Sequence, residues 1–373
     1  MKFNRYALSD LATIKYGKNQ KKVLSESGNI PIYGTGGLMG FATTALYDKP
    51  SVLIGRKGTI GKVKYVEHPF WTVDTLFYTI VNTDIVLPKY LYYVMSLIDL
   101  NNYNEGTTIP SLRTETLNRL EFDIPSLEEQ ETILSCLNPI DEKIALNNAI
   151  NNNLEQQAMA LFKSWFIDFE PFNRQVPKTW INGVLGDFVE IKRGGSPRPI
   201  QNFLSDSGFH WLKISDATGI SSPFINEIKE YIIEAGLKKT VYLKSGSLVL
   251  SNSATPGLPK ILDIDTCIHD GWLYFPSSKF SNEYLYLYFK HIRDNLIALG
   301  NGSVFTNLKT DILKNYPTYL PTEDVLKKFD ELVQPIFSMI LSKTREIKRL
   351  VEIRDTLLPK LMSGELDVSD IDI

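Results

Sequence analysis

Two short segments of this 373-residue chain hold residue types that could do chemistry. The first is GRKGTIGKV at residues 55–63, which has the glycines and the lysine of a phosphate-binding loop. However, Gly55 and Gly61 are one residue too far apart, and Val63 replaces the Ser or Thr that would hold Mg²⁺. We therefore expect no nucleotide site in this segment.

The second segment, CIHDGW at residues 267–272, brings a cysteine, a histidine and an aspartate together. Its counterpart in an internal repeat described below is WTVDTL at residues 71–76, which has neither the cysteine nor the histidine. The other histidines show no spacing typical of metal ligands. The Asp/Asn-Pro-Pro-Tyr/Phe tetrapeptide of adenine methyltransferases is also absent. The sequence therefore predicts neither a catalytic centre nor a metal site.

A third pattern is a set of basic and small polar residues on glycine-rich turns between β-type runs. Glycine lets the backbone approach a phosphate closely, Lys and Arg supply counterion-releasing contacts, and Arg, Asn, Ser and Thr can read base edges. This pattern favours nucleic-acid binding, although solvated turns remain the alternative for any single residue. The residues that we expect to contact DNA are Tyr33, Thr35, Arg56, Lys57, Thr59, Lys62, Lys64, Arg113, Arg193, Ser196, Arg198, Lys213, Asn252, Ser253, Thr255 and Lys260.

Charge is distributed unevenly along the chain, although the net charge is only −3. Residues 15–64 hold nine Lys or Arg against two acidic residues, whereas residues 121–170 hold ten acidic residues against two lysines.

Asp74 and Asp270 occupy equivalent positions in the repeat, and we interpret both as turn-capping residues rather than base contacts.

Composition sets the class of protein. With 43% hydrophobic residues, a chain of this length is expected to form two or three globular domains. Cys136 and Cys267 are the only cysteines, which argues against a disulfide scaffold or a four-cysteine zinc site. No signal peptide and no apolar run of about 18 residues is visible, so we expect a cytoplasmic protein without a membrane span.

The chain is an internal duplication. LSDLATIKYG at residues 8–17 matches LGDFVEIKRG at residues 185–194, an offset of 177. From Gly61 and Gly257 onward the offset is 196, so the second copy holds about 19 extra residues between Gly194 and Val249. Each copy begins with short β-type runs broken by Gly, Pro and Asn, which indicate a mixed α/β globule with a curved sheet.

Each globule is followed by a segment whose apolar residues recur at steps of four and three, the spacing of a coiled-coil seam. Two such helices in one chain can bury each other, so we expect an antiparallel coiled coil with pseudo-twofold symmetry. Pro139 and Pro335 fall at the same heptad point, where we expect a break or a kink. The expected fold class is α+β, with globules at 1–125 and 171–321, helices at 126–170 and 322–366, and an acidic tail at 367–373.

These features resemble the specificity (S) subunits of type I restriction-modification systems. The resemblance is carried by VPKTWINGVLGDFVEIKRG at the start of the second copy and by TTIPSLRTETLNRLEFDIPSLEEQETI at the end of the first globule. The helical segments IDEKIALNNAINNNLEQQAMALFKSWFIDFEPF and LVEIRDTLLPKLMSGEL are similar to the central and C-terminal conserved regions of that family. One departure is LPTEDVLKKFDELVQPI, which lacks the PSLEEQ of the first copy, so the second helix could dock its partner differently.

The resemblance implies a non-catalytic subunit for defence against foreign DNA. Two target-recognition domains would each read one half of a bipartite double-stranded DNA target, and the coiled coil would set the gap. Two methyltransferase (M) subunits would dock on the helices and methylate adenine with S-adenosylmethionine. Restriction (R) subunits would add ATP- and Mg²⁺-dependent cleavage, so those cofactors belong to the partners and none to this chain.

The apolar residues near the ends of the two helices are the expected partner contacts. They are Leu161, Phe162, Trp165, Phe166, Leu357, Leu358, Leu361 and Met362. Plain coiled-coil core is the alternative for about half of them. We expect truncation at Pro359 to weaken partner assembly more than it unfolds either globule.

Two other functions remain open at this stage. The first is a DNA-modifying enzyme with an unrecognised catalytic centre, which would methylate or cleave DNA alone. The second is a protein-binding scaffold without DNA recognition, which would be unaffected by loss of Arg56, Lys57 and Lys62.

Overall fold

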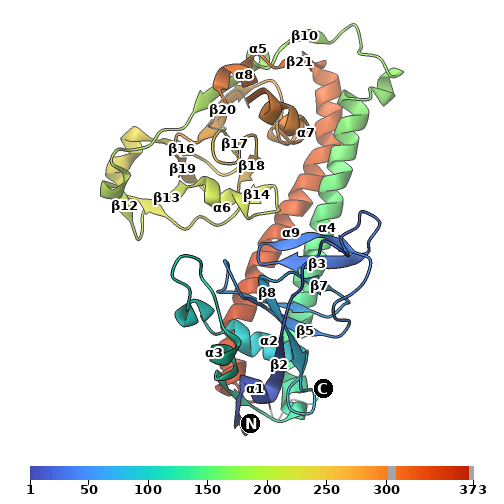
Figure 1. The fold of residues 1–373 in the computed structure, drawn as a ribbon. Coiled ribbons are helices and arrows are strands. Elements are labelled where there is room, and N and C mark those ends of the chain that lie inside the picture. The colour runs from blue at the N-terminus through green and yellow to red at the C-terminus, as the bar shows by residue number, and fades with distance from the viewer. Residues whose placement is uncertain (301–307, 369–373) are drawn as a thin grey trace. The chain divides into compact units, whose positions relative to one another are not determined.

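The computed structural model describes residues 1–300 and 308–368. It divides into two compact units: unit 1 comprises Met1–Lys143 and Leu350–Ile373, and unit 2 comprises Ile144–Arg349. Two long helices, α4 (Leu127–Phe166) and α9 (Glu323–Ser363), each contribute one part to each unit (Figure 1). Residues 369–373, most of the expected acidic tail, lie outside the described residues.

Unit 1 contains a 4-stranded sheet of order β2-β8-β5-β6, a 3-stranded sheet of order β4-β3-β7, and the ribbon β1-β9. The apolar run SVLIG forms β5, which is buried along its whole length because α2 packs on this sheet. The strands are β1 (Asn4–Ala7), β2 (Ala12–Tyr16), β3 (Ile30–Gly34), β4 (Gly37–Ala42), β5 (Ser51–Gly55), β6 (Val63–Val66), β7 (Trp71–Thr72), β8 (Leu76–Val81) and β9 (Glu121–Ile124). The short helices are α1 (Leu8–Leu11), α2 (Pro88–Ser96) and α3 (Thr114–Asn118).

Unit 2 repeats this plan with two 5-stranded sheets, of order β11-β20-β17-β18-β14 and β12-β15-β13-β19-β16, and the ribbon β10-β21. The helix α7 (Asn282–Gly300) packs on β17 and β18, as α2 does in unit 1. The strands are β10 (Ile181–Val184), β11 (Val189–Arg193), β12 (Leu204–Ser205), β13 (Phe209–Leu212), β14 (Phe224–Ile225), β15 (Tyr231–Ile232), β16 (Val241–Leu243), β17 (Leu248–Ser251), β18 (Pro259–Leu262), β19 (Thr266–Ile268), β20 (Trp272–Ser278) and β21 (Pro317–Leu320). The short helices are α5 (Leu185–Phe188), α6 (Ile214–Thr218) and α8 (Thr310–Lys314).

The duplication is visible in individual hydrogen bonds. In unit 1 the Leu112 N–H donates to the Arg56 carbonyl (3.0 Å), and in unit 2 the equivalent Leu308 N–H donates to the Asn252 carbonyl (2.7 Å). In unit 1 the parallel pair β3–β7 lies in the 3-stranded sheet, and in unit 2 the parallel pair β13–β19 lies in the sheet of order β12-β15-β13-β19-β16. The extra residues of the second copy form α6 and β14 between β13 and β15, where unit 1 has only the tight turn between β3 and β4. The predicted mixed α/β globules are confirmed.

In unit 1, the first part of α4 packs against the last part of α9. Arg354 Nη1 donates to Asp141 Oδ1 (3.2 Å), and the same carboxylate accepts from the Tyr93 hydroxyl of α2. Apolar residues of both helices belong to the core cluster of this unit, which includes Ile133, Leu134, Leu137, Leu358, Leu361 and Met362. The end of α9 is therefore part of the unit 1 core.

In unit 2, the remaining part of α4 packs antiparallel to the first part of α9. Asn151 Nδ2 lies 3.3 Å from Thr344 Oγ1, and further along the pair the Phe166 ring lies 4.8 Å from that of Phe329. Asn147 is fully buried and neither of its amide atoms has a partner among the described residues. Both asparagines thus lie in the helix pair, where such polar residues can fix register.

Of the break or kink expected at the two prolines, the break is absent, because α4 and α9 are continuous through Pro139 and Pro335. Both prolines are exposed, so water can satisfy the carbonyl that each ring leaves without its helical partner.

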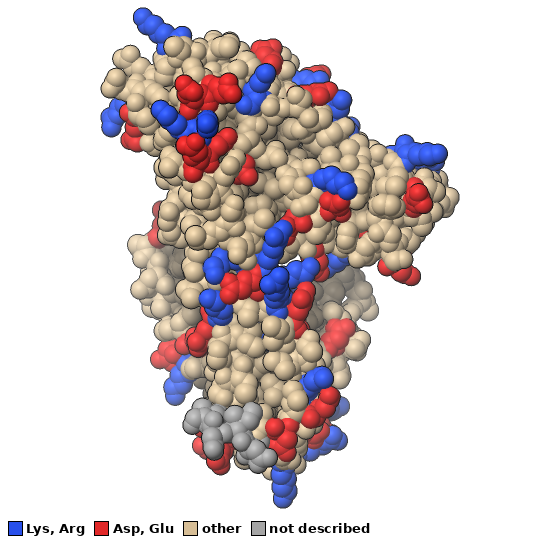
Figure 2. Space-filling model, turned by 180° about the vertical axis from the view of Figure 1, so that it is seen from behind, with Lys and Arg blue, Asp and Glu red and all other residues tan. Residues whose placement is uncertain are grey.

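Three further observations concern the helices, the cysteines and the possible metal ligands. None of the described helices is long and apolar enough to span a bilayer, and both cysteines are free thiols. Among the described residues no group of three His, Cys, Asp or Glu could hold a metal ion. On the face shown in Figure 2, Lys and Arg side chains are interspersed with Asp and Glu.

Candidate nucleic-acid interface

In unit 1, several predicted DNA-binding residues share one open cavity of about 310 Å³. It lies where β3, β5 and β6 meet, and Gly34, Gly37 and Gly55 line it together with polar side chains. The predicted residues that line it are Tyr33, Thr35, Thr59, Lys62 and Lys64. Residues separated by more than 25 positions in the sequence are thus brought to one surface.

Lys64 and Tyr33 form a cation–π pair inside this cavity. The Lys64 Nζ lies 3.7 Å from the centroid of the Tyr33 ring, and the Tyr33 hydroxyl lies 3.3 Å from His68 Nε2. Burial lowers the pKa of Lys64 and raises the pKa of Tyr33. The aromatic face holds the ammonium group in place without neutralising it, so it can still attract a phosphate.

The turn that follows β5 is fixed by its backbone. The Arg56 and Lys57 N–H groups both donate to the Thr75 carbonyl (2.8 and 3.2 Å), and Arg56 Nη1 donates to the Asp74 carbonyl (2.9 Å). The Arg56 guanidinium also lies 5.0 Å from the centroid of the Tyr16 ring. The two basic side chains are therefore presented from an ordered turn.

The remaining predicted residue of unit 1 is Arg113, the N-cap of α3, whose Nε lies 3.1 Å from Glu105 Oε2. By contrast, Arg56, Lys57, Lys62 and Lys64 have no carboxylate within ion-pair distance among the described residues. Unit 1 thus presents several uncompensated cations.

In unit 2, the predicted residues Arg193, Ser196, Arg198 and Asn252 converge on Asp270. Its carboxylate accepts from Ser196 Oγ (2.7 Å) and Arg198 Nη2 (3.2 Å), while its carbonyl accepts from Arg193 Nε and Asn252 Nδ2. The equivalent Arg56–Asp74 bond of unit 1 shows that this turn is a repeated element.

Asn252 is buried in this turn, with 3% of its surface exposed, and its Oδ1 has no partner among the described residues. Ser253 and Thr255 follow it and are half-buried. Between them Ala254 has a φ of 58°, which places the turn in the left-handed region.

Two other predicted residues of unit 2 have internal partners. Lys213 forms an ion pair with Glu230 on β15's N-terminal flank. Lys260 is 2% exposed, and its Nζ donates to the carbonyls of Ile220 (2.6 Å) and Ser222 (2.5 Å).

The burial of Lys260 does not fit the predicted DNA contact. The residues that cover it lie between α6 and β14, the segment that unit 1 lacks. Lysine therefore occurs at the equivalent position of both units, Lys64 and Lys260, but in unit 2 the inserted segment buries it.

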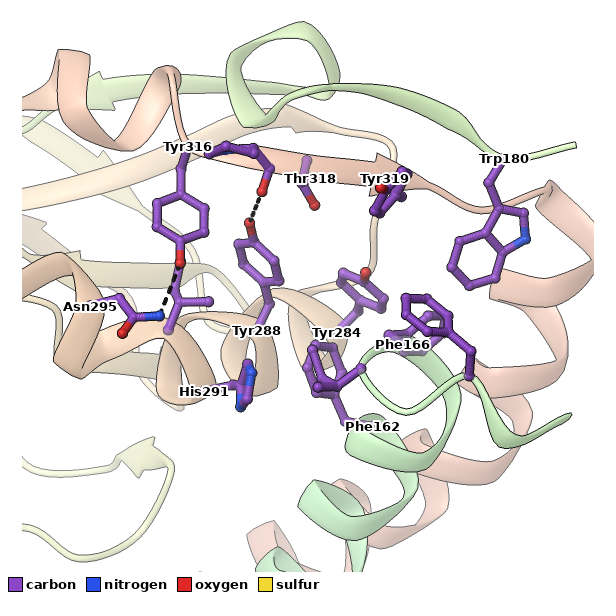
Figure 3. Close-up of a pocket in the computed structure, with 14 residues that line it drawn as sticks. Phe162, Phe166, Trp180, Tyr284, Tyr288, His291, Asn295, Tyr316, Thr318 and Tyr319 are labelled. Atoms are coloured by element: carbon purple, nitrogen blue, oxygen red, sulfur yellow. Dashed lines mark hydrogen bonds between the residues drawn. The ribbon is translucent and has the colours of Figure 1, made fainter. Parts of the chain in front are cut away.

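The predicted partner-binding residues of unit 2 form an aromatic cluster around a cavity of about 250 Å³. Phe162 and Phe166 of α4 point toward Tyr284 of α7, at ring distances of 5.3 and 4.9 Å (Figure 3). Tyr288 and Thr318 close the cavity from α7 and β21. Leu161 and Trp165 are half-buried against the same cluster.

Burial within this chain limits what these side chains can offer a partner. Phe162 is fully buried, and Leu358, Leu361 and Met362 are between 4% and 8% exposed. Such side chains do not fit the predicted partner contact, because they belong to the core clusters of their own units. Leu161, Trp165 and Leu357 retain partial exposure.

Sequence reasoning missed two residues of this surface. Asp270 was assigned only a capping role, although its recurrence as Asp74 in the first copy was a usable signal. The second is Tyr16, which is 51% exposed and whose ring lies under the Arg56 guanidinium. No sequence pattern marked this tyrosine as part of the surface.

The fold and the site together define a class of protein. It is a tandem repeat of two units, each of which carries one polar turn that contains glycine, and both units include parts of the same two long helices. The chain matches the family model "Type I restriction modification DNA specificity domain" at residues 2–156 and 177–349, and it belongs to this family.

Particular relatives cover nearly the whole chain. The "Type I restriction enzyme MjaIX specificity subunit" of Methanocaldococcus jannaschii is 29% identical over 350 residues, which cover 87% of this chain and 80% of the relative. The "Type I restriction enzyme HindI specificity subunit" of Haemophilus influenzae is 26% identical and covers 82% of this chain and 84% of its own length. Among solved structures, the S subunit of a type I restriction-modification system from M. genitalium matches with a TM-score of 0.62, at 15% identity, over 97% of this chain and 96% of that one. This last match shows the same fold.

Proposed function

We propose that this chain is the non-catalytic DNA sequence-specificity subunit of a type I restriction-modification complex. The observation that carries the proposal is one turn used twice with different side chains. The turn holds Arg56 and Lys57 in unit 1 where unit 2 has Asn252 and Ser253, whereas the third position is a threonine in both, Thr59 and Thr255. Two equivalent frames with different polar groups suit the reading of two different half-sites.

In this proposal residues 1–125 and 171–321 are the two target-recognition domains. The helices at 126–170 and 322–366 form an antiparallel coiled coil with pseudo-twofold symmetry, which sets the gap between the half-sites. Methyltransferase subunits, two in number, dock on these helices, and restriction subunits complete the complex. S-adenosylmethionine, ATP and Mg²⁺ act in those partners, and the complex works in the cytoplasm.

The decisive experiment measures binding to two duplexes by the chain assembled with its methyltransferase partner. One duplex carries the target mapped by single-molecule sequencing of adenine methylation in the source genome, and the other is random DNA of the same length. We expect the target to bind tighter by a factor on the order of 10³ or more. Equal binding would refute the proposal, and methylation or cleavage by the chain alone would favour the enzyme alternative.

A second measurement separates a DNA reader from a protein scaffold. Lys57→Gln combined with Lys62→Gln removes two uncompensated cations, so the salt dependence of DNA binding should become shallower by up to about 0.9 per lost phosphate contact. Lys244→Gln is the matched control, because Lys244 is 73% exposed but already paired with Asp265. A slope that stays unchanged in the double variant would favour the scaffold.

A further inference from the structure

Asp270 occupies an unusual place for a carboxylate. It is 41% exposed and lies in the middle of residues expected to face a polyanion. A negative charge at such a surface repels phosphate and weakens binding to any DNA. A carboxylate at this position therefore needs a compensating role.

Its contacts supply that role. The side chain holds Ser196 and Arg198, and the backbone carbonyl holds Arg193 and Asn252. The Asp270 N–H also donates to Ser196 Oγ (3.2 Å), so the hydroxyl is fixed from two directions. One residue thus orders side chains from β11, from the loop after it and from the end of β17.

Unit 1 offers an internal comparison. Asp74 at the equivalent position keeps the backbone bond, because Arg56 Nη1 donates to its carbonyl, but its carboxylate has no partner among the described residues. The backbone role is therefore common to both units, whereas the side-chain role belongs to unit 2 alone.

The charge state of Asp270 fits this role. Burial favours the neutral acid, but the Ser196 hydrogen bond and the charges of Arg198, His269 and Arg193 outweigh it and hold the pKa of Asp270 below its ordinary value. The group is therefore a carboxylate at neutral pH and accepts hydrogen bonds from charged donors, which are the stronger kind.

We propose that Asp270 is the positioning residue of the second half-site reader: its carboxylate holds Arg198 and Ser196 in the orientation that reads bases. This inference rests on the proposed function and adds to it. Pre-ordered side chains lose less conformational freedom on binding, and a fixed donor discriminates better between base edges. The cost is a weaker general attraction to DNA, so the carboxylate raises specificity at the expense of non-specific affinity.

The test is Asp270→Asn in the chain assembled with its methyltransferase partner. The amide keeps the size of the side chain and removes its charge. We expect affinity for the mapped target duplex to fall about tenfold, the loss of one charge-assisted hydrogen bond. Affinity for random DNA should stay the same or rise, because a negative charge has been removed.

Asp265→Asn is the matched control. Asp265 lies in the same unit, is 36% exposed and pairs with Lys244 (2.7 Å), but it contacts none of the predicted DNA-binding residues. We expect no loss of discrimination in this variant. If Asp270→Asn instead weakens or strengthens both duplexes equally, or behaves as the control does, the positioning role is wrong.

Two further readouts keep the outcomes distinct. In the background of Arg198→Gln, Asp270→Asn should cost less than it does alone, because the pair acts as a unit; additive losses would overturn the proposal. Substitutions at the first half-site of the target should be discriminated as in the wild type.

The failure of the proposed function can be told apart from the failure of this inference. If the wild-type complex does not distinguish target from random DNA, the proposed function is wrong. If the wild-type complex does distinguish them and Asp270→Asn distinguishes them equally well, only the role of Asp270 is wrong.

Discussion

Lys64 and Lys260 occupy the same position of the repeat and have opposite environments. Lys64 is exposed over the Tyr33 ring, whereas Lys260 is enclosed and bound to two carbonyls of the inserted segment. Burial lowers the pKa of Lys260 to about 8, and the nearby Glu155 only partly opposes this. The same residue type therefore serves as a surface cation in unit 1 and as a structural donor in unit 2.

This difference predicts a pH dependence of stability. Between pH 8 and about 10.5 the unfolded chain still binds the Lys260 proton while the folded chain has lost it, so the contribution of this group to stability rises with pH. The free energy of unfolding of the wild type minus that of Lys260→Met should therefore increase from pH 8 to 10, by an amount on the order of 3 kcal/mol at most.

Urea unfolding followed by tryptophan fluorescence measures this difference, because Trp165, Trp180, Trp211 and Trp272 lie in unit 2 and only Trp71 lies in unit 1. Lys244→Met is the control, because pairing with Asp265 raises the pKa of Lys244 and the same difference should therefore not increase over this range. A difference that is flat or falls with pH would contradict the burial of a charged lysine at this position.

At the scale of elements, the two ends of the helix pair use different chemistry at equivalent positions. In unit 1 Asp141, Tyr93 and Arg354 form a half-buried polar triad. The equivalent residues of unit 2 are Phe337, Phe289 and Ala158, which are all buried in its apolar core. Since replacing a buried ion pair with matched apolar residues is often neutral, both solutions are compatible with a stable fold.

The triad leads to a stability prediction. Arg354→Ala should destabilise unit 1 by about 1–3 kcal/mol, because it removes the closer cation of the Asp141 carboxylate in a site that is only 22% exposed and leaves only Lys89, at 3.9 Å. Replacing the whole triad with the residues of unit 2 (Tyr93→Phe, Asp141→Phe, Arg354→Ala) should cost less than the single change. Arg5→Ala is the control, since its partner Asp123 is 53% exposed and surface pairs contribute little. Thermal unfolding followed by circular dichroism compares the three; a triple variant less stable than Arg354→Ala would contradict the argument.

The end of α9 leads to a second prediction at this scale, opposite to the one made from the sequence. Truncation before Pro359 removes Leu361, Met362 and Val368, which are buried in the unit 1 core. Because each lost core side chain costs about 2–5 kcal/mol, we expect unit 1 to unfold while unit 2 keeps its fluorescence transition. Hydrogen exchange of residues 1–143 reports the outcome. If unit 1 of the truncated chain keeps full protection from hydrogen exchange but the chain no longer assembles with its partner, the prediction made from the sequence is correct instead.

At the scale of the whole molecule, the shared helices connect the two readers. The proposed function requires that helix length determine the gap between half-sites. Seven residues added to α4 and seven to α9 keep the apolar seam in register and lengthen each helix by about 10 Å, close to the rise of three base pairs.

We therefore expect the chain with a heptad inserted in both helices to select the same two half-sites with a longer spacer. Sequencing of adenine methylation in cells that carry the altered chain identifies the new target. A heptad in only one helix is the control, and it should abolish methylation because the seam no longer pairs. Changed half-sites in the doubly extended chain would refute the spacer role.

The sequence by itself determined the repeat, the α/β character of each copy, the two long helices and the family. These follow from local periodicity and from a register that recurs over the whole chain, so they need no knowledge of what packs on what. It also located the turn at Arg56 and Asn252, because glycines and polar residues mark turns directly.

Only the tertiary structure decided which of the predicted residues are available. Lys260, Phe162 and Leu361 carry the same local signals as exposed residues, but their burial depends on segments far away in the chain. The role of Asp270 depends likewise on Ser196 and Arg198, about seventy residues earlier. Pairing across such distances is set by packing and by the placement of an inserted segment, which no local pattern records.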